Sequence, residues 1–114
     1  MNARRQAYAD LLGAAADLRT RVANTAMYGG DEMLTRLAEI RRSAADVEVK
    51  AAKVAFAAGV LAERAGTLAS AATGLAAAAV RNTNADNVMV TPDFSAFDSA
   101  VDEFRAKAID SADQ

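Results

Sequence analysis

Alanines recur at strict seven-residue intervals through the middle of this chain. The alanine row continues the register of Leu37 and consists of Ala44, Ala51, Ala58, Ala65, Ala72 and Ala79. A row of larger apolar residues, each three positions after a member of that register, consists of Ile40, Val47, Val54, Leu61, Leu68 and Leu75. Alternating steps of three and four residues place both rows on one face of a helix. The pattern therefore predicts a long helix whose narrow seam of small and large side chains packs closely against other helices.

A first helical segment is predicted over residues 3–27. The residues that repeat the spacing of three and four are Tyr8, Leu11, Ala15, Leu18, Val22 and Thr25, and such a stripe is typical of a buried helix face. Gly29 and Gly30 are expected to end this helix, because glycine readily adopts the left-handed conformation found at helix C-termini. Asp31 then predicts the N-cap of the next helix, since its carboxylate can accept bonds from free backbone N–H groups.

The alanine row lies within a second segment, residues 32–81, which contains no proline. As one continuous helix this segment would be about 75 Å long. A break near Gly59 or Gly66 would instead divide it into two helices and give a compact four-helix bundle. The glycines inside the segment, Gly74 included, mark either such a kink or a place where another helix comes close. The broken form suits a monomer, and the long helix suits an oligomer.

A third segment, residues 92–111, follows a polar loop. Thr91 predicts its N-cap and Pro92 its first helical position, where the missing N–H costs nothing. The apolar residues on one face of this segment are Phe94, Phe97, Val101, Phe104 and Ala108. The three long segments predict one all-α domain over residues 1–114, an antiparallel helical bundle or coiled coil whose middle helix is continuous or broken into two.

Charge is sparse in the second half of the middle segment, where Glu63 and Arg64 are the only charged residues between positions 54 and 80. The third segment cannot cover a helix that is apolar nearly all round, and soluble monomers rarely expose large apolar patches. We therefore expect the chain to form a homo-oligomer, in the simplest case a dimer, or to bind another helical protein. The residues predicted to carry packing or this interface are Ala58, Leu61, Ala65, Leu68, Ala72, Leu75, Phe94, Phe97 and Phe104.

The chain lacks the side chains that most often carry catalysis and metal binding. It contains no histidine and no cysteine, which removes the usual acid–base group near neutral pH and the usual zinc ligands. Its glycines lack the spacing of a phosphate-binding loop. We therefore expect no enzymatic activity and no cofactor. The net charge of −2 and the absence of a basic face argue against nucleic acid as a partner.

One loop has a distant likeness to a calcium-binding loop. The oxygen-bearing side chains at its first, third, fifth and twelfth positions are Asn82, Asn84, Asp86 and Asp93. Asparagine replaces the usual aspartate at the first position, Asn87 the glycine at the sixth, and aspartate the glutamate at the twelfth. Because asparagine and aspartate are also ordinary loop residues, a capped polar loop without metal is the favoured interpretation.

No membrane span is predicted. The uncharged stretch Ala65–Val80 is shorter than the about 20 mostly apolar residues that a spanning helix needs. The first residues run directly into the helical pattern without an apolar leader segment, which predicts no secretory signal. We expect a cytoplasmic protein, and secretion by a route that needs no signal peptide stays open.

Residues 4–12 read Arg-Arg-Gln-Ala-Tyr-Ala-Asp-Leu-Leu. Later features are Leu37-Ala-x-Ile40-Arg41, Val54-Ala-Phe56 and the closing Phe97-Asp98. This set resembles small, alanine-rich, uncharacterised actinobacterial proteins in which a similar helix, often directly after a membrane anchor, begins a coiled-coil-like domain. The resemblance implies a helical domain of unknown role with membrane proximity, although the anchor segment itself is not found in this chain.

Several functional classes remain open at this stage. Tyr28-x-x-x-Glu32 has the spacing of the export signal of small helical hairpins secreted by type VII systems. It lies in a turn near the N-terminus instead of after the hairpin, and the Trp-x-Gly turn is missing. A phage or mobile-element structural component and a ligand-binding bundle with a cavity lined by Tyr8 or the phenylalanines are further alternatives. The favoured interpretation is a non-enzymatic protein–protein interaction or assembly module that self-associates.

Overall fold

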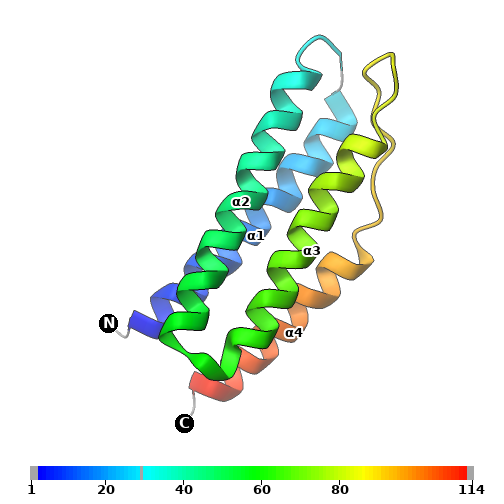
Figure 1. Ribbon diagram of the computed structural model, residues 1–114. Helices are drawn as coiled ribbons and strands as arrows, with labels where there is room; N and C mark the ends of the chain where they lie inside the picture. The colour runs from blue at the N-terminus through cyan, green and yellow to red at the C-terminus, as the bar shows by residue number, and fades with distance from the viewer. Residues whose placement is uncertain (1–2, 29, 113–114) are drawn as a thin grey trace.

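The computed structural model describes residues 3–28 and 30–112 (Figure 1). Its elements are α1 (Ala3–Tyr28), α2 (Met33–Ala57), the short 3₁₀ turn η1 (Gly59–Leu61), α3 (Ala62–Arg81) and α4 (Ser95–Ala112). The described part of the chain is all-helical, as predicted, with four helices packed together and one isolated β-bridge between Thr83 and Met89.

The four helices lie side by side along the long axis of the molecule (Figure 1). The overall extents are 51 × 23 × 16 Å. Each connection turns the chain back, so the start of α1 and the end of α4 lie at the same end of the molecule. Within this arrangement α2 packs against both α1 and α3, and α4 packs mainly against α3.

The turn between α1 and α2 differs from the prediction in one respect. Gly30 has a φ of 92°, the left-handed conformation expected of a glycine there, whereas Gly29 lies outside the described residues. The prediction that Asp31 caps α2 is wrong, because Asp31 lies in the turn and α2 begins only at Met33. A backbone bond from Met33 N–H to the Gly30 carbonyl (3.0 Å) closes the turn, so the helix starts after it.

The middle segment is broken at Ala58, which gives the four-helix alternative rather than one long helix. Ala58 has φ −147° and ψ 87°, outside the helical region, and η1 turns the chain into α3. The break leaves the seam intact, since Ala58 and Leu61 on either side of the turn are both buried. Reversal at this point lets the two halves of the seam face the same core, which a single straight helix cannot do.

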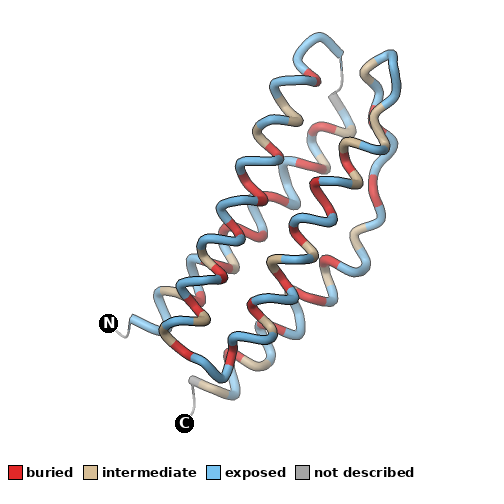
Figure 2. Tube along the Cα trace, in the orientation of Figure 1, coloured by how far each residue is buried: buried red, intermediate tan, exposed pale blue. Residues whose placement is uncertain are grey.

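The core confirms the predicted buried faces. Every member of the alanine row and of the larger apolar row that follows it is buried, and so is the predicted stripe of α1. The buried residues of α4 are Phe97, Ala100, Phe104 and Ala108. The rings of Tyr8 and Phe104 meet edge to face, with centroids 6.2 Å apart. Figure 2 shows the buried turns of all four helices directed toward one another.

The start of α4 is also corrected. The helix begins at Ser95, three residues later than expected, and Pro92 is a buried residue of the preceding loop. The Asp93 carboxylate accepts hydrogen bonds from the Ser95 backbone N–H (2.8 Å) and hydroxyl (2.6 Å). These bonds, the hydroxyl's first, lower the pKa of Asp93. Asp93 thus satisfies a free backbone donor at the helix start, the role predicted for Thr91.

Candidate interaction surface

The residues predicted as the interface lie inside the molecule. Ala58, the buried residues of α3 and the two phenylalanines Phe97 and Phe104 belong to the core, and Phe94 is partly buried against it. Their contacts are therefore made between helices of one chain. Whether any of them also contacts a second chain stays a prediction.

The outward side of α3 carries small residues instead of a large apolar patch. Its exposed positions include Gly66, Ser70, Thr73, Gly74 and Ala77. Among the described residues, no atom outside the local backbone lies within 4 Å of a Cβ added at Gly66 or Gly74. No other helix of this chain therefore approaches closely at these two glycines.

Large exposed apolar side chains occur on several other elements: Met27, Leu34, Val49, Phe56, Val60, Val88, Val90 and Ile109. Phe56, near the end of α2, is 96% exposed, and Val49, two helical turns earlier on the same side, is 51% exposed. Both belong to a row on the outward side of α2 with steps of three and four residues. We call this set the outer row; its members are Ala38, Arg42, Ala45, Val49, Ala52 and Phe56, all exposed.

The outer row was not among the predictions from the sequence, although a second seven-residue repeat indicates it. Ala38, Ala45 and Ala52 repeat at seven-residue intervals. They directly follow Leu37, Ala44 and Ala51, which belong to the register of the buried alanine row. A larger side chain follows each of them four positions later. Two heptad rows on one helix indicate two packing faces, and no helix of the described residues covers the second face.

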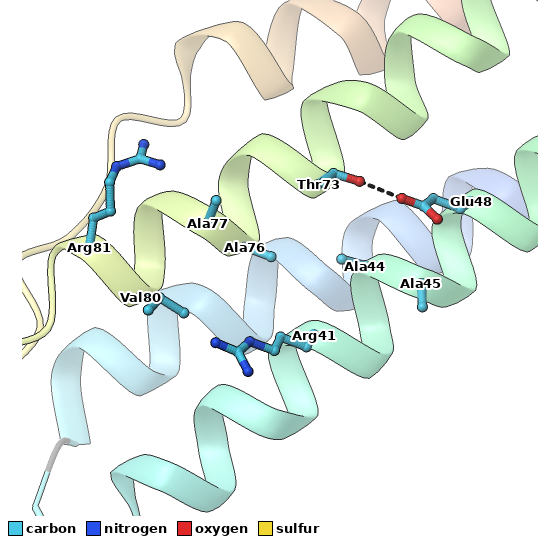
Figure 3. A pocket seen from close by; sticks show the side chains of 9 residues that line it. All are labelled: Arg41, Ala44, Ala45, Glu48, Thr73, Ala76, Ala77, Val80 and Arg81. Carbon is cyan, nitrogen blue, oxygen red and sulfur yellow. Dashed lines mark hydrogen bonds between the residues drawn. The ribbon is translucent and has the colours of Figure 1, made fainter.

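A groove of about 470 Å³ runs beside the outer row, between α2 and α3 (Figure 3). The groove is lined by Arg41, Ala44, Ala45, Glu48, Thr73, Ala76, Ala77, Val80 and Arg81. At one end the Thr73 hydroxyl donates to the Glu48 carboxylate, which links α3 to α2. At the other end the side chains of Arg41 and Arg81 extend in different directions. The groove thus has a floor of alanines and charges of both signs at its rim.

Arg19 links α1 to α4. Its guanidinium donates two hydrogen bonds to the Asp98 carboxylate (2.8 and 3.0 Å) and lies 4.3 Å above the centre of the Phe94 ring. The hydrogen bond from Arg19 lowers the pKa of Asp98, and the same bond raises that of Arg19. Asp98 also lies in the first turn of α4, where the helix dipole favours a negative charge.

We expect Asp98→Asn to destabilise the fold modestly at neutral pH and hardly at all in acid. The pKa of Asp98 is lower in the folded protein than in the unfolded chain. The ionised carboxylate therefore stabilises the fold fully at pH values above its pKa in the unfolded chain, and this stabilisation is lost as the pH falls through its pKa in the folded protein. Both side chains are nearly half exposed, so the loss at pH 7 should be about 0.5–1 kcal/mol. Urea unfolding of both proteins from pH 7 down to about pH 2 measures it, and a difference that is undiminished at the lowest pH would contradict this account.

A second groove lies between α1 and α4, beside Phe97 and Val101, with a volume of about 350 Å³. The Arg19–Asp98 ion pair forms part of its rim. Tyr8, one of the residues that could line a cavity in the ligand-binding alternative, packs against the Phe104 ring. Of the side chains named for the ligand-binding alternative, Phe97 lines this groove.

The loop of the calcium prediction is organised by its own hydrogen bonds. The Asn84 side-chain oxygen accepts bonds from the backbone N–H groups of Asp86 (2.9 Å) and Val88 (3.1 Å). The Asn82 side-chain amide donates to the Val90 carbonyl (3.1 Å), and Asp93 accepts from Ser95. Within residues 3–28 and 30–112, no group of three or more acidic, His or Cys side chains could hold a metal. The polar-loop interpretation accounts for these bonds, and calcium binding stays a prediction.

Comparison with known protein families, curated proteins and solved structures finds no match to this chain. Among the helices that the structure describes, none combines the length and apolarity needed to cross a bilayer.

Proposed function

We propose that this protein is a non-enzymatic protein–protein interaction or assembly module that self-associates. In this proposal the four helices form an antiparallel bundle whose buried seam supports folding, and an outward helix face contacts the partner. The observation that carries the proposal is the outer row of α2, which ends in the 96% exposed ring of Phe56. A packing pattern that repeats on the uncovered side of a helix is expected to be covered in the working assembly.

The composition supports the same class of function. Without histidine and cysteine, the chain lacks the side chains on which most acid–base, nucleophilic and metal-dependent catalysis at neutral pH depends. The groove between α2 and α3 is lined mainly by alanine, with charges at its rim. Helix faces of this kind suit the ridges of another helix better than a polar substrate.

The mass in solution tests the proposal. We expect light scattering on a size-exclusion column to give twice the chain mass of 11.8 kDa at high concentration, with dissociation on dilution. A concentration series from micromolar to millimolar separates a specific dimer, which stops at two chains, from open-ended aggregation. A monomer across the whole series would refute self-association and leave another helical protein as the partner.

A further inference from the structure

The outer row of α2 points to a particular partner and orientation. We propose that it binds the outer row of a second copy of this chain, with the two α2 helices antiparallel. This inference rests on the proposed function and specifies the surface and the register of the self-association. It places the contact on α2 and not on the residues of α3 and α4 that were first predicted.

The row is complementary to itself when reversed. Its small residues, Ala38, Ala45 and Ala52, alternate with the larger Arg42, Val49 and Phe56. In an antiparallel pair, residues from the two seam positions face each other, so Phe56 and Val49 of one copy meet the small Ala45 and Ala52 of the second. Alanines at seven-residue spacing also let the two helix axes come closer than the usual 8–10 Å.

Space for a second helix exists on this side of α2. The neighbours of α2 in the chain are α1 and α3, and both pack on its inner and lateral sides (Figures 1 and 2). The outer row runs along the exposed side, where Phe56 makes almost no contact with its own chain. A second α2 can therefore lie on the row without displacing any helix.

Charges beside the row select one register. Asp46 and Lys53 lie seven residues apart on the edge of the row that faces away from α3. The Asp46 carboxylate is half exposed and pairs with Lys50 of its own helix (3.5 Å), whereas Lys53 has no ion pair within the described residues. If Phe56 lies on Ala45 of the second copy, each Asp46 comes within reach of the opposite Lys53. Sliding the helices by one heptad, so that Phe56 lies on Ala38, brings the two Asp46 carboxylates together instead. Electrostatics thus favours the first register.

Charge exchange tests the surface directly. We expect Lys53→Asp to raise the dimer Kd about 10-fold or more, because symmetry converts two favourable pairs into two like-charge pairs. The double variant Asp46→Lys/Lys53→Asp should restore most of the affinity. Phe56→Glu should leave a folded monomer, since the ring is exposed within the chain. Ile109→Glu, at an exposed position of α4, is the matched control and should still dimerise.

Disulfide trapping tests the register, and the chain has no cysteine of its own to interfere. The variant Ala45→Cys/Phe56→Cys should form a cross-linked dimer on mild oxidation. The two positions are about 16 Å apart along one helix, too far for a bond within a chain. Ala38→Cys/Phe56→Cys reports the shifted register, and Ala45→Cys alone reports a parallel pair. Cross-linking of either control in preference to the first variant would overturn the proposed register.

The outcomes separate this inference from the proposed function. A wild-type dimer that Lys53→Asp and Phe56→Glu leave intact would overturn the α2 surface while keeping self-association. A wild-type monomer at all concentrations would overturn both. A dimer that loses affinity with Lys53→Asp and regains it in the charge-exchanged variant would support the surface and the orientation together, because only a partner of identical sequence can supply the compensating charge.

Discussion

Replacing Phe104 with alanine is expected to lower the free energy of unfolding by about 3–5 kcal/mol. The Phe104 side chain is completely buried, and its ring meets that of Tyr8 edge to face, so it joins α4 to α1. The substitution removes this apolar contact and opens a cavity that closely packed helices cannot fully close. The free energy of unfolding of a small domain is about 5–15 kcal/mol in total, so this single change should remove a large part of it.

Urea denaturation followed by far-UV circular dichroism measures this effect. Ile109→Ala, on the same helix but exposed, is the matched control, and it should change the free energy of unfolding by no more than about 0.5 kcal/mol. Equal effects of the two substitutions would mean that Phe104 is not packed in the core as described.

Ala72→Leu is expected to destabilise the fold by about 1–3 kcal/mol through overfilling. Ala72 has no exposed surface, and its heptad neighbours Ala65 and Ala79 are equally buried. The extra atoms of leucine can be accommodated only if α3 moves away from its neighbours or if side chains leave their preferred rotamers. The larger apolar side chain is therefore expected to lower the free energy of unfolding at this position instead of raising it.

The comparison with Ala77→Leu isolates the role of packing. Ala77 lies on the same helix, in the exposed wall of the α2–α3 groove, and leucine there should alter the free energy of unfolding by no more than about 0.5 kcal/mol. Thermal unfolding of both variants provides the measurement. An unchanged melting temperature for Ala72→Leu would contradict a closely packed alanine seam.

The buried faces could be predicted from the sequence because their period is that of the helix. Steps of three and four residues bring Ala44, Val47 and Ala51 to one side whatever the tertiary arrangement. The ends of the helices were harder to predict, since several residues near each end can satisfy the free backbone groups. Asp31 and Thr91 are both good N-caps by residue type. In the structure, however, the Gly30 carbonyl accepts the bond from the first residue of α2, and the Asp93 carboxylate accepts the bond from the first residue of α4.

The candidate surface was predicted on the weakly charged half of the middle segment for an identifiable reason. The stretch from residue 54 to 80 has few charges, and low charge alone did not distinguish a helix packed within the chain from one that needs a second chain. After the chain turns at Ala58, α2 and α4 cover the apolar side of α3, and its outward positions hold small residues such as Ser70 and Thr73. The outer row lies on α2, in a stretch with many charged residues, and was therefore not predicted as a packing face.

By itself, the sequence determined that this protein is helical and which side chains face the core, because both follow from a local period and from helix-forming residues. The tertiary structure alone decided where the long middle segment reverses. The heptad pattern passes through Ala58 without interruption, and Gly59 and Gly66 both offered a break, so the sequence did not choose between these two breaks and a continuous helix. The selection comes from pairing α2 with α3, since burial of both halves of the seam against each other outweighs the cost of one broken helical turn.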